Sequence, residues 1–237
     1  MESLRWSWLG RVEYSVAREL QESLARQLAE GLGPEMLLCL EHPAVFTMGR
    51  NRSVSEAVQE TAARAGVPIL RTDRGGDLTW HGPGQLVLYP VMRLRAAGLG
   101  VRTFVTALTG ALQDAAAAVQ VRSWCDPQQP GLFVGDRDGR RKLGSVGLAV
   151  RRGITLHGAA LNLERTAEEG FLGLAPCGLA GVRPTSLAAE APANVPAPAS
   201  AQCAALVAQA LAGRLNYAGL LRLSATELLG GAARHTQ

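Results

Sequence analysis

Residues 132–163 have the sequence LFVGDRDGRRKLGSVGLAVRRGITLHGAALNL, in which three apolar runs are separated by two turn motifs. The first motif, Gly135-Asp136-Arg137-Asp138-Gly139, joins the first run to a candidate strand from Lys142 to Val150. Arg151-Arg152-Gly153 then turns the chain into a further candidate strand, from Ile154 to Leu163. Consecutive strands joined by short turns predict an α+β fold with hairpins, rather than a regular alternation of strands and helices.

The chain on both sides of these hairpins supplies three candidate helices and two further strands. The helices are predicted from apolar residues that recur at helical spacing, and the strands from short apolar runs. The predicted helices are Ser15–Glu30, Thr103–Val121 and Ala201–Leu215, and the predicted strands are Met36–Leu40 and Leu86–Val91. Strands therefore outnumber helices, in agreement with the α+β prediction.

The length of 237 residues fits one large domain. We expect this domain to span residues 1–215 and to include an exposed connection, rich in proline and alanine, at residues 190–200. Residues 216–237 are expected to form a C-terminal tail, with Gly230–Gln237 frayed.

The composition indicates a globular protein of the cytoplasm. No run approaches the roughly 18 apolar residues of a membrane span, and the N-terminus lacks the apolar segment of a signal peptide. The four cysteines lie far apart without a Cys-x-x-Cys pair, so we expect reduced thiols and no metal site. A net charge of +4 favours an acidic partner, whereas scattered basic residues and 5% aromatic residues argue against nucleic-acid binding. Nothing in the sequence suggests an obligate interface, so we expect a monomer.

Lys142 is the only lysine among the 24 basic side chains, and every other one is an arginine. A guanidinium stays charged at any accessible pH, whereas the pKa of an ammonium can be tuned by burial and by its neighbours. A lysine that persists in such a composition is therefore a candidate for a task that requires proton transfer. The alternative is a surface lysine without a function.

Residues 74–85, RGGDLTWHGPGQ, combine four glycines with the polar side chains of Arg74 and His81. Glycine is needed where the backbone passes close to a ligand or takes a positive φ. The segment lacks both the dinucleotide fingerprint and the P-loop pattern, so it is not a phosphate cradle of either kind. A ligand-binding loop and a tight hairpin with structural glycines both remain possible.

Small residues recur on the two candidate strands that follow. The sequences KLGSVG at residues 142–147 and TLHGAALN at residues 155–162 place glycines and alanines on adjacent strands. Such residues would leave a slot suited to a thin apolar group such as an acyl chain. Close packing of a helix on the sheet explains the same residues equally well.

Cys177 is the best candidate for a nucleophile, because Pro176 and Gly178 place it on a bend rather than inside a helix. Cys39, by contrast, falls within an apolar strand and is expected to be a packed core thiol. A nearby ammonium lowers the pKa of a thiol from about 8.5 to roughly 3.5–7.5, and the thiolate is the reactive form. A Cys–Lys pair could therefore attack a thioester or ester carbonyl and handle the proton of the incoming nucleophile.

These segments resemble the lipoyl(octanoyl) transferase family, whose members move an octanoyl group from acyl carrier protein to a lipoyl-domain lysine. The resemblance covers most of the chain and is carried by residues 9–14 (LGRVEY), 41–50, 74–85, 142–147, 157–162 and 176–178. Trp80 stands where tyrosine is common in this family, and Asp77 where glutamine is common. The stretch after Leu187 matches poorly.

The resemblance implies the catalytic-domain fold of biotin and lipoyl ligases, with mixed, mostly antiparallel sheets flanked by helices. It implies that Cys177 carries an acyl thioester, and that Lys142 lowers the pKa of that thiol and acts as acid and base. It implies no ATP and no metal, and it implies that phosphopantetheine arrives on the acyl carrier protein. The implied partners are octanoyl-acyl carrier protein, the lipoyl domains of 2-oxoacid dehydrogenases and the glycine cleavage H protein. The implied substrate-binding residues are Arg74, Gly75, Gly76, Asp77, Leu78, Thr79, Trp80, His81, Ser145, Val146, Gly147, His157, Gly158, Ala159 and Ala160.

Two alternatives remain open at this point. An ATP-dependent lipoate or biotin ligase on the same fold would use the lysine to contact an acyl-adenylate and would need no cysteine. A non-catalytic module would dock acidic carrier domains without becoming acylated. Arg140, Arg141, Arg151 and Arg152 are the residues expected to dock acidic carriers.

Overall fold

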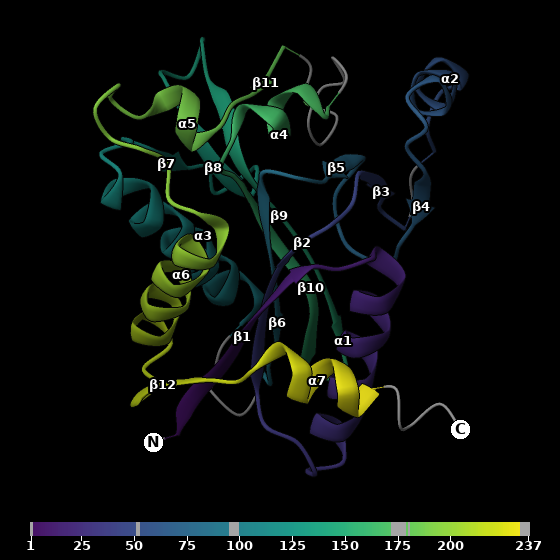
Figure 1. Cartoon of the computed structure of the whole chain (residues 1–237), viewed down its shortest axis with the longest axis vertical. Coiled ribbons are helices and arrows are strands. Elements are labelled where there is room, and N and C mark those ends of the chain that lie inside the picture. The colour runs from purple at the N-terminus through teal and green to yellow at the C-terminus, as the bar shows by residue number, and fades with distance from the viewer. Residues whose placement is uncertain (1, 51–52, 95–99, 172–178, 180, 233–237) are drawn as a thin grey trace.

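A large mixed sheet forms the centre of the protein, with a small sheet at one end (Figure 1). The computed structural model describes residues 2–50, 53–94, 100–171, 179 and 181–232. The large sheet has the strand order β12-β1-β2-β6-β10-β9-β8-β7, with β11 paired to β9, and the small sheet has the order β4-β3-β5. The strands are β1 (Ser3–Arg11), β2 (Met36–Glu41), β3 (Val45–Met48), β4 (Ile69–Arg71), β5 (Thr79–His81), β6 (Gln85–Val91), β7 (Trp124–Cys125), β8 (Gly131–Val134), β9 (Arg141–Arg151), β10 (Ile154–Asn162), β11 (Arg183–Pro184) and β12 (Gly219–Arg222). The helices are α1 (Tyr14–Ala29), α2 (Glu56–Arg64), α3 (Val101–Ala118), α4 (Arg165–Glu169), α5 (Leu187–Glu190), α6 (Ser200–Arg214) and α7 (Ala225–Ala232).

The two hairpins predicted from residues 132–163 are present. β8 and β9 are antiparallel neighbours, and β9 pairs with β10 from Arg151 opposite Ile154 to Gly144 opposite Leu161. β6 lies antiparallel between β10 and β2, whereas β1 runs parallel to both β2 and β12. The prediction of an α+β fold with a mixed, mostly antiparallel sheet is therefore confirmed.

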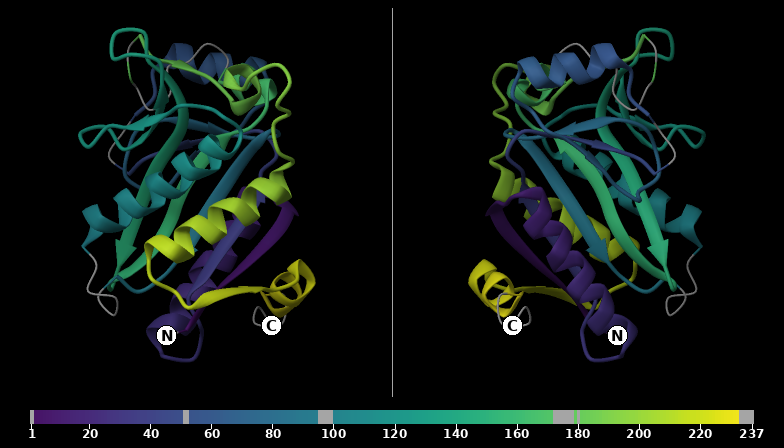
Figure 2. Two further views of the ribbon diagram at one scale, coloured as in Figure 1. Left: turned by 90° about the vertical axis from the view of Figure 1, so that its left-hand side faces the viewer. Right: turned by 90° about the vertical axis from the view of Figure 1, so that its right-hand side faces the viewer.

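Helices cover both faces of the large sheet, as Figure 2 shows for α6 on one face and α1 on the other. Alternating residues of β2 supply the two cores, because successive side chains of a strand point to opposite faces. Leu37 and Cys39 lie in the core beneath α3 and α6, whereas Leu38 and Leu40 lie in the core beneath α1. Cys39 is fully buried, as its apolar strand predicts. None of the helices that the structure describes is long and apolar enough to cross a membrane.

The small sheet has its own core, which the sequence analysis did not anticipate because its strands have three or four residues. Trp80 of β5 lies in this core with Phe46 and Phe171. Gly82 and Gly170 lie against the Trp80 indole, since a Cβ added at either glycine would be 2.2 Å from the ring. The glycines of this region therefore make room for a large buried side chain.

The segment after residue 215 is integrated into the fold. β12 extends the large sheet by pairing in parallel with β1, from Ser3 opposite Gly219 to Trp6 opposite Arg222. α7 contacts α1 and β1. The connection at residues 190–200, expected to be exposed, is partly buried, because Val195 and Ala197 pack against the core beneath α6. Residues 233–237 of the expected frayed end lie outside the described residues, and residues 230–232 belong to α7.

Candidate active site

A cavity lies beside the central hairpin. Its walls come from β9 and β10, from β6 and the start of α1, and from the loop between β4 and β5 together with β5 itself. It is lined by Tyr14, Arg74, Gly76, Thr79, His81, Val87, Tyr89, Ser145, Val146, Gly147, His157, Gly158, Ala159 and Ala160.

Most of the substrate-binding residues expected from the sequence border this cavity, although they come from three separate segments. Those on the cavity wall are Arg74, Gly76, Thr79, His81, Ser145, Val146, Gly147, His157, Gly158, Ala159 and Ala160. Gly75 lies just outside, where its N–H donates to the Leu148 carbonyl at 2.9 Å. Trp80 and Leu78 belong to the core of the small sheet, and Asp77 is half-buried in the loop. Cys177 lies outside the described residues.

The two glycines at the centre of the hairpin permit close approach of backbone. Gly147 and Gly158 are paired across β9 and β10. A Cβ added at Gly147 would be 3.0 Å from the Gly75 carbonyl oxygen, and one added at Gly158 would be 2.1 Å from the Leu88 carbonyl oxygen. These glycines therefore bring the β4–β5 loop and β6 against the hairpin, and the small residues around them leave the cavity open.

Replacing Gly158 by alanine is expected to destabilise the protein by about 3 kcal/mol, because the new methyl group would force β6 and β10 apart. Urea unfolding measures this change. Gly213→Ala is the matched control, since no atom lies within 4 Å of a Cβ added there. Equal unfolding midpoints for the two variants would show that β6 and β10 can separate without cost.

Lys142 is a buried cation at the start of β9, with 3% of its surface exposed. Its Nζ lies 5.2 Å from the centre of the Phe133 ring, a distance at which the ring face attracts an ammonium. Gly131 provides the space on the neighbouring strand, since a Cβ there would be 3.0 Å from Lys142 Cε. The backbone of Lys142 is held from its other side by Thr185, whose N–H donates to the Lys142 carbonyl at 3.0 Å.

A chain of buried hydrogen bonds links the cavity to the segment beside Lys142. The Gln85 amide nitrogen donates to Asn162 Oδ1 at 2.9 Å, and the Asn162 amide donates to the Thr185 carbonyl at 2.8 Å. Gln85 Oε1 is 2.6 Å from His81 Nδ1, so the proton of this imidazole is on Nδ1. Burial first, and the proximity of His42 next, lower the pKa of His81 to about 3, and the ring is neutral.

A second buried histidine, His42, lies against the tyrosines of the cavity. His42 Nδ1 donates to the Val12 carbonyl at 2.6 Å, and its Nε2 accepts from the Tyr89 hydroxyl at 2.8 Å. Burial lowers the pKa of His42 to about 4, so this imidazole is also neutral. The Tyr14 hydroxyl and Thr79 Oγ1 are buried without a hydrogen-bond partner in the described part of the chain. Burial raises the pKa of Tyr14 to about 12, so its hydroxyl keeps its proton beside the cavity.

Three residues of the cavity wall, Tyr14, Val87 and Tyr89, were not singled out by the sequence analysis. Tyr14 falls in a segment that carries the family resemblance, and Tyr89 is a hydroxyl-bearing residue in an otherwise apolar strand. Because a buried polar group needs a hydrogen-bond partner, a tyrosine in an apolar strand is the signal in the sequence that could have marked Tyr89.

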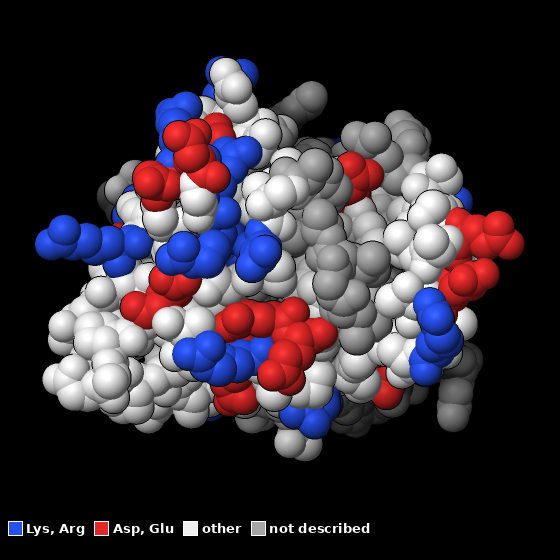
Figure 3. Space-filling view, turned by 90° about the horizontal axis from the view of Figure 1, so that it is seen from above, with Lys and Arg blue, Asp and Glu red and all other residues white. Residues whose placement is uncertain are grey.

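The arginines expected to dock an acidic carrier are largely engaged within the chain. Arg140 pairs with Asp126 at 3.2 Å, and Arg141 makes two contacts with the Glu190 carboxylate, at 2.6 and 2.9 Å. Arg151 pairs with Asp73 at 2.5 Å. On the described part of the upper face, arginine side chains are interspersed with acidic ones (Figure 3). The arrangement is a mixed surface rather than a continuous basic field.

The described residues contain no group of three or more His, Cys, Asp or Glu side chains that could hold a metal ion.

Comparison of the sequence with known proteins identifies the family. A sequence model described as the lipoyl protein ligase A/B catalytic domain matches residues 13–207. An octanoyltransferase of Mycolicibacterium gilvum is 41% identical over 182 residues, which cover 76% of this chain and 73% of that protein.

Two solved structures share the fold. The first is a structure from the lipoylation system of Thermoplasma acidophilum, described as a bipartite lipoate protein ligase and its E2 lipoyl domain. Its TM-score is 0.70 at 12% sequence identity, and the match covers 99% of this chain and 91% of that one. A biotin protein ligase of Aquifex aeolicus has a TM-score of 0.51 and 11% identity, with coverage of 91% and 71%. The solved structures show only a shared fold, whereas the sequence matches show the family. The chain belongs to the octanoyltransferases, enzymes of the lipoate and biotin protein ligase superfamily.

Proposed function

We propose that this enzyme transfers an octanoyl group from octanoyl-acyl carrier protein to a lysine of a lipoyl domain, through a thioester on Cys177. One juxtaposition supports the proposal most strongly. The buried Lys142 lies on β9, the same strand that contributes Ser145, Val146 and Gly147 to the cavity wall. A cavity lined by small residues, on a strand that also carries the lysine, suits an acyl chain whose carbonyl reacts with a thiolate.

The reaction would proceed in two half-reactions with Cys177 and Lys142 as an ion pair at the start. The Cys177 thiolate attacks the thioester carbonyl, a new carbon–sulfur bond forms as the old one breaks, and Lys142 gives its proton to the departing phosphopantetheine thiol. The neutral amine of the acceptor lysine then attacks the acyl-enzyme. A carbon–nitrogen bond forms, the Cys177 thiolate leaves, and the uncharged Lys142 takes the proton of the amine.

This chemistry would need no ATP, because conversion of a thioester into an amide is downhill, and none of the proposed steps uses a metal ion. The acceptors would be the lipoyl domains of 2-oxoacid dehydrogenases and the glycine cleavage H protein. The Thermoplasma ligase, which shares the fold and is described together with its E2 lipoyl domain, supports an acceptor of this class. We infer that the chain acts as one catalytic domain that includes β12 and α7 as well as residues 1–215, and that the enzyme works as a monomer.

Intact-mass measurement tests the proposal directly. The protein is incubated with octanoyl-acyl carrier protein in the absence of ATP, and the expected result is the gain of one octanoyl group that hydroxylamine removes. Cys177→Ser is expected to show no hydroxylamine-labile gain, and Cys125→Ser is the matched control that keeps it. Acylation of a lipoyl domain only when free octanoate and ATP are supplied would contradict the proposal and identify a ligase.

A further inference from the structure

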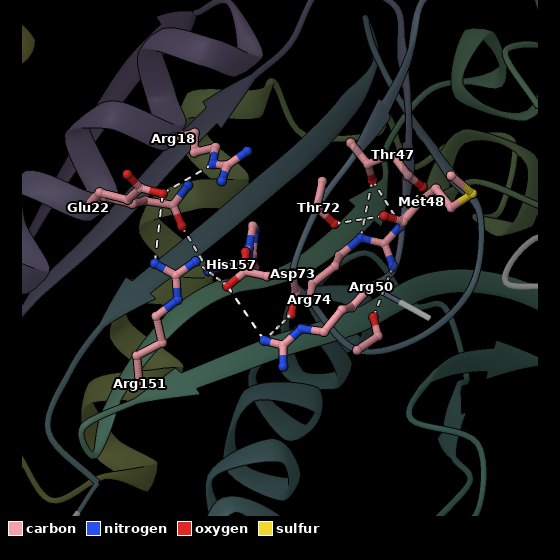
Figure 4. A network of polar contacts seen from close by, with 12 residues as sticks. Arg18, Glu22, Thr47, Met48, Arg50, Thr72, Asp73, Arg74, Arg151 and His157 are labelled. Atoms are coloured by element: carbon pink, nitrogen blue, oxygen red, sulfur yellow. Dashed lines mark hydrogen bonds and ion pairs between the residues drawn. The ribbon is translucent and has the colours of Figure 1, made fainter. Parts of the chain in front are cut away.

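Two consecutive residues of the β4–β5 loop, Asp73 and Arg74, are anchored to different sheets (Figure 4). The Asp73 carboxylate accepts a hydrogen bond from His157 Nε2 of β10 at 2.8 Å, and from Arg151 of β9 at 2.5 Å. The Arg74 guanidinium instead donates to the Thr47 hydroxyl of β3, at 3.2 Å from Nε. The loop is thus fastened to the large sheet by Asp73 and to the small sheet by Arg74.

The contact between Asp73 and His157 is largely buried. The side chain of Asp73 is 17% exposed and that of His157 is 6% exposed. Burial disfavours the charge of Asp73, but the hydrogen bonds from His157 and Arg151 outweigh it and lower the pKa of the carboxyl to about 2. Burial lowers the pKa of His157, so a neutral imidazole donates its Nε2 proton to the carboxylate.

His157 is itself held in an unusual backbone conformation. Its φ is +57°, inside β10, in the left-handed region that a non-glycine residue seldom occupies. Its N–H donates to the side-chain oxygen of Gln21 in α1, at 2.8 Å. Residues in this region persist where the surrounding structure over-determines them, and they concentrate at functional sites. The helix thus fixes the histidine, and the histidine fixes Asp73.

Arg151 completes the anchor from the end of the hairpin. Besides Asp73, its guanidinium contacts Glu22 of α1 at 3.9 Å, and Glu22 also accepts from Arg18 at 3.2 Å (Figure 4). The charge of Arg151 is therefore used within the chain to connect α1, β9 and the loop. This use differs from the carrier docking expected from the sequence.

The anchored loop is one wall of the cavity. Arg74 and Gly76 line the cavity, and Gly75 lies between them with its N–H bonded to the Leu148 carbonyl. Because Gly147 has no side chain, the Gly75 carbonyl can lie directly on β9. Gly75 donates one hydrogen bond to β9, whereas the Asp73 carboxylate is held by His157, by Arg151 and, at 4.0 Å, by Arg50. These contacts together define one position of the loop.

We propose that Asp73 is a positioning residue that, through His157 and Arg151, holds residues 73–76 against β9 and thereby sets the width of the acyl cavity. The proposal rests on the proposed function for its substrate, an unbranched medium-length acyl chain. It assigns to Asp73 no contact with the reacting atoms. Its consequence is selectivity, because a loop that moves away from β9 widens the cavity along its length.

Kinetics with small substrates tests this role on the full-length enzyme. With a soluble octanoyl thioester as donor, Asp73→Asn is expected to raise KM about tenfold while kcat changes little, because acyl binding is weakened and the reacting groups are untouched. The preference for octanoyl over 4-methyloctanoyl thioester is expected to fall by a similar factor. Asp138→Asn, in the exposed β8–β9 turn, is the matched control. Unchanged KM and unchanged selectivity in Asp73→Asn would overturn the proposal.

Hydrogen exchange tests whether Asp73 holds the β4–β5 loop in place, and it does so without measuring octanoyl transfer. Asp73→Asn is expected to speed amide exchange in peptides that span residues 72–79 by about tenfold, with exchange in β6 and α6 unchanged. Arg151→Gln is expected to give a smaller increase, since His157 would still hold one carboxylate oxygen. Normal exchange in both variants would show that Asp73 does not hold the loop, even if the enzyme proved inactive toward octanoyl donors. Altered exchange in an enzyme that never becomes acylated would instead reject the substrate assignment alone.

Discussion

Replacing Lys142 by arginine is expected to lower the rate of octanoyl transfer by roughly 100-fold or more, although the positive charge is retained, because the proposed general acid–base role would be lost. An ammonium can give its proton to the departing thiol and recover one from the attacking amine. A guanidinium stays protonated at every accessible pH and can do neither.

The surroundings of Lys142 add a steric reason for the same result. The side chain is 3% exposed, with the Phe133 ring 5.2 Å from Nζ. Gly131 leaves no more than the space that the lysine stem occupies, because a single added carbon there would be 3.0 Å from Cε. The wider, planar guanidinium would have to displace β8 or turn away from the reacting groups.

Single-turnover transfer from octanoyl-acyl carrier protein measures the effect, with thermal unfolding as the check on folding. Lys142→Met separates charge from proton exchange, since it keeps the length of the side chain and removes both. Alkylation of Cys177 by iodoacetamide should slow in Lys142→Met and remain faster in Lys142→Arg, because a fixed positive charge still favours the thiolate. Transfer by Lys142→Arg at the rate of the unaltered enzyme would show that charge suffices.

Acid is expected to destabilise the enzyme well above the pH at which most carboxylates titrate. Burial lowers the pKa of His42 to about 4 and that of His81 to about 3, both from an ordinary value of 6.5. Near pH 5 the unfolded chain therefore binds two protons that the folded chain does not. Each such proton makes the free energy of unfolding fall by about 1.4 kcal/mol per unit of decreasing pH, or about 2.7 kcal/mol for the pair.

The sign follows from the direction of the two shifts. Stability is fully present above the unfolded pKa of 6.5 and is lost as the pH falls through the range between 6.5 and the folded values. His157, whose pKa burial also lowers, adds to the slope in the same direction. The shift of Asp73 acts later, below its ordinary value of 3.8, as the pH approaches 2.

Urea unfolding at a series of pH values between 7 and 5 measures this slope. His42→Gln is the informative variant, because its amide can donate to Val12 and accept from Tyr89 but does not titrate in this range. In this variant the change in unfolding free energy per pH unit should be smaller by about 1.4 kcal/mol, the contribution of one histidine. Stability that does not change with pH from 6.5 to 5 would mean that both imidazoles can be protonated inside the folded protein.

The site illustrates which residues a sequence can and cannot mark. Lys142 stands out by composition, and the Gly147–Gly158 pair by the small residues around it. Trp80 lies in the same glycine-rich segment as Arg74 and His81, yet it packs in the core of the small sheet. A one-residue step along β5 turns a side chain to the other face, and only the placement of the sheet shows which face borders the cavity.

By itself, the amino-acid sequence determined the α+β class, the hairpins of residues 132–163, the three long helices and the candidate role of Lys142. These features depend on local periodicity, on turn residues and on composition, all of which act over a few neighbouring positions. The tertiary structure alone decided the pairing of β10 with β6, the small sheet, the use of Arg151 inside the chain and the link from Asp73 to His157, which is 84 residues away. The physical reason is that strand pairing and the partner of a charge depend on groups brought together from distant parts of the chain, whose identity no local pattern contains.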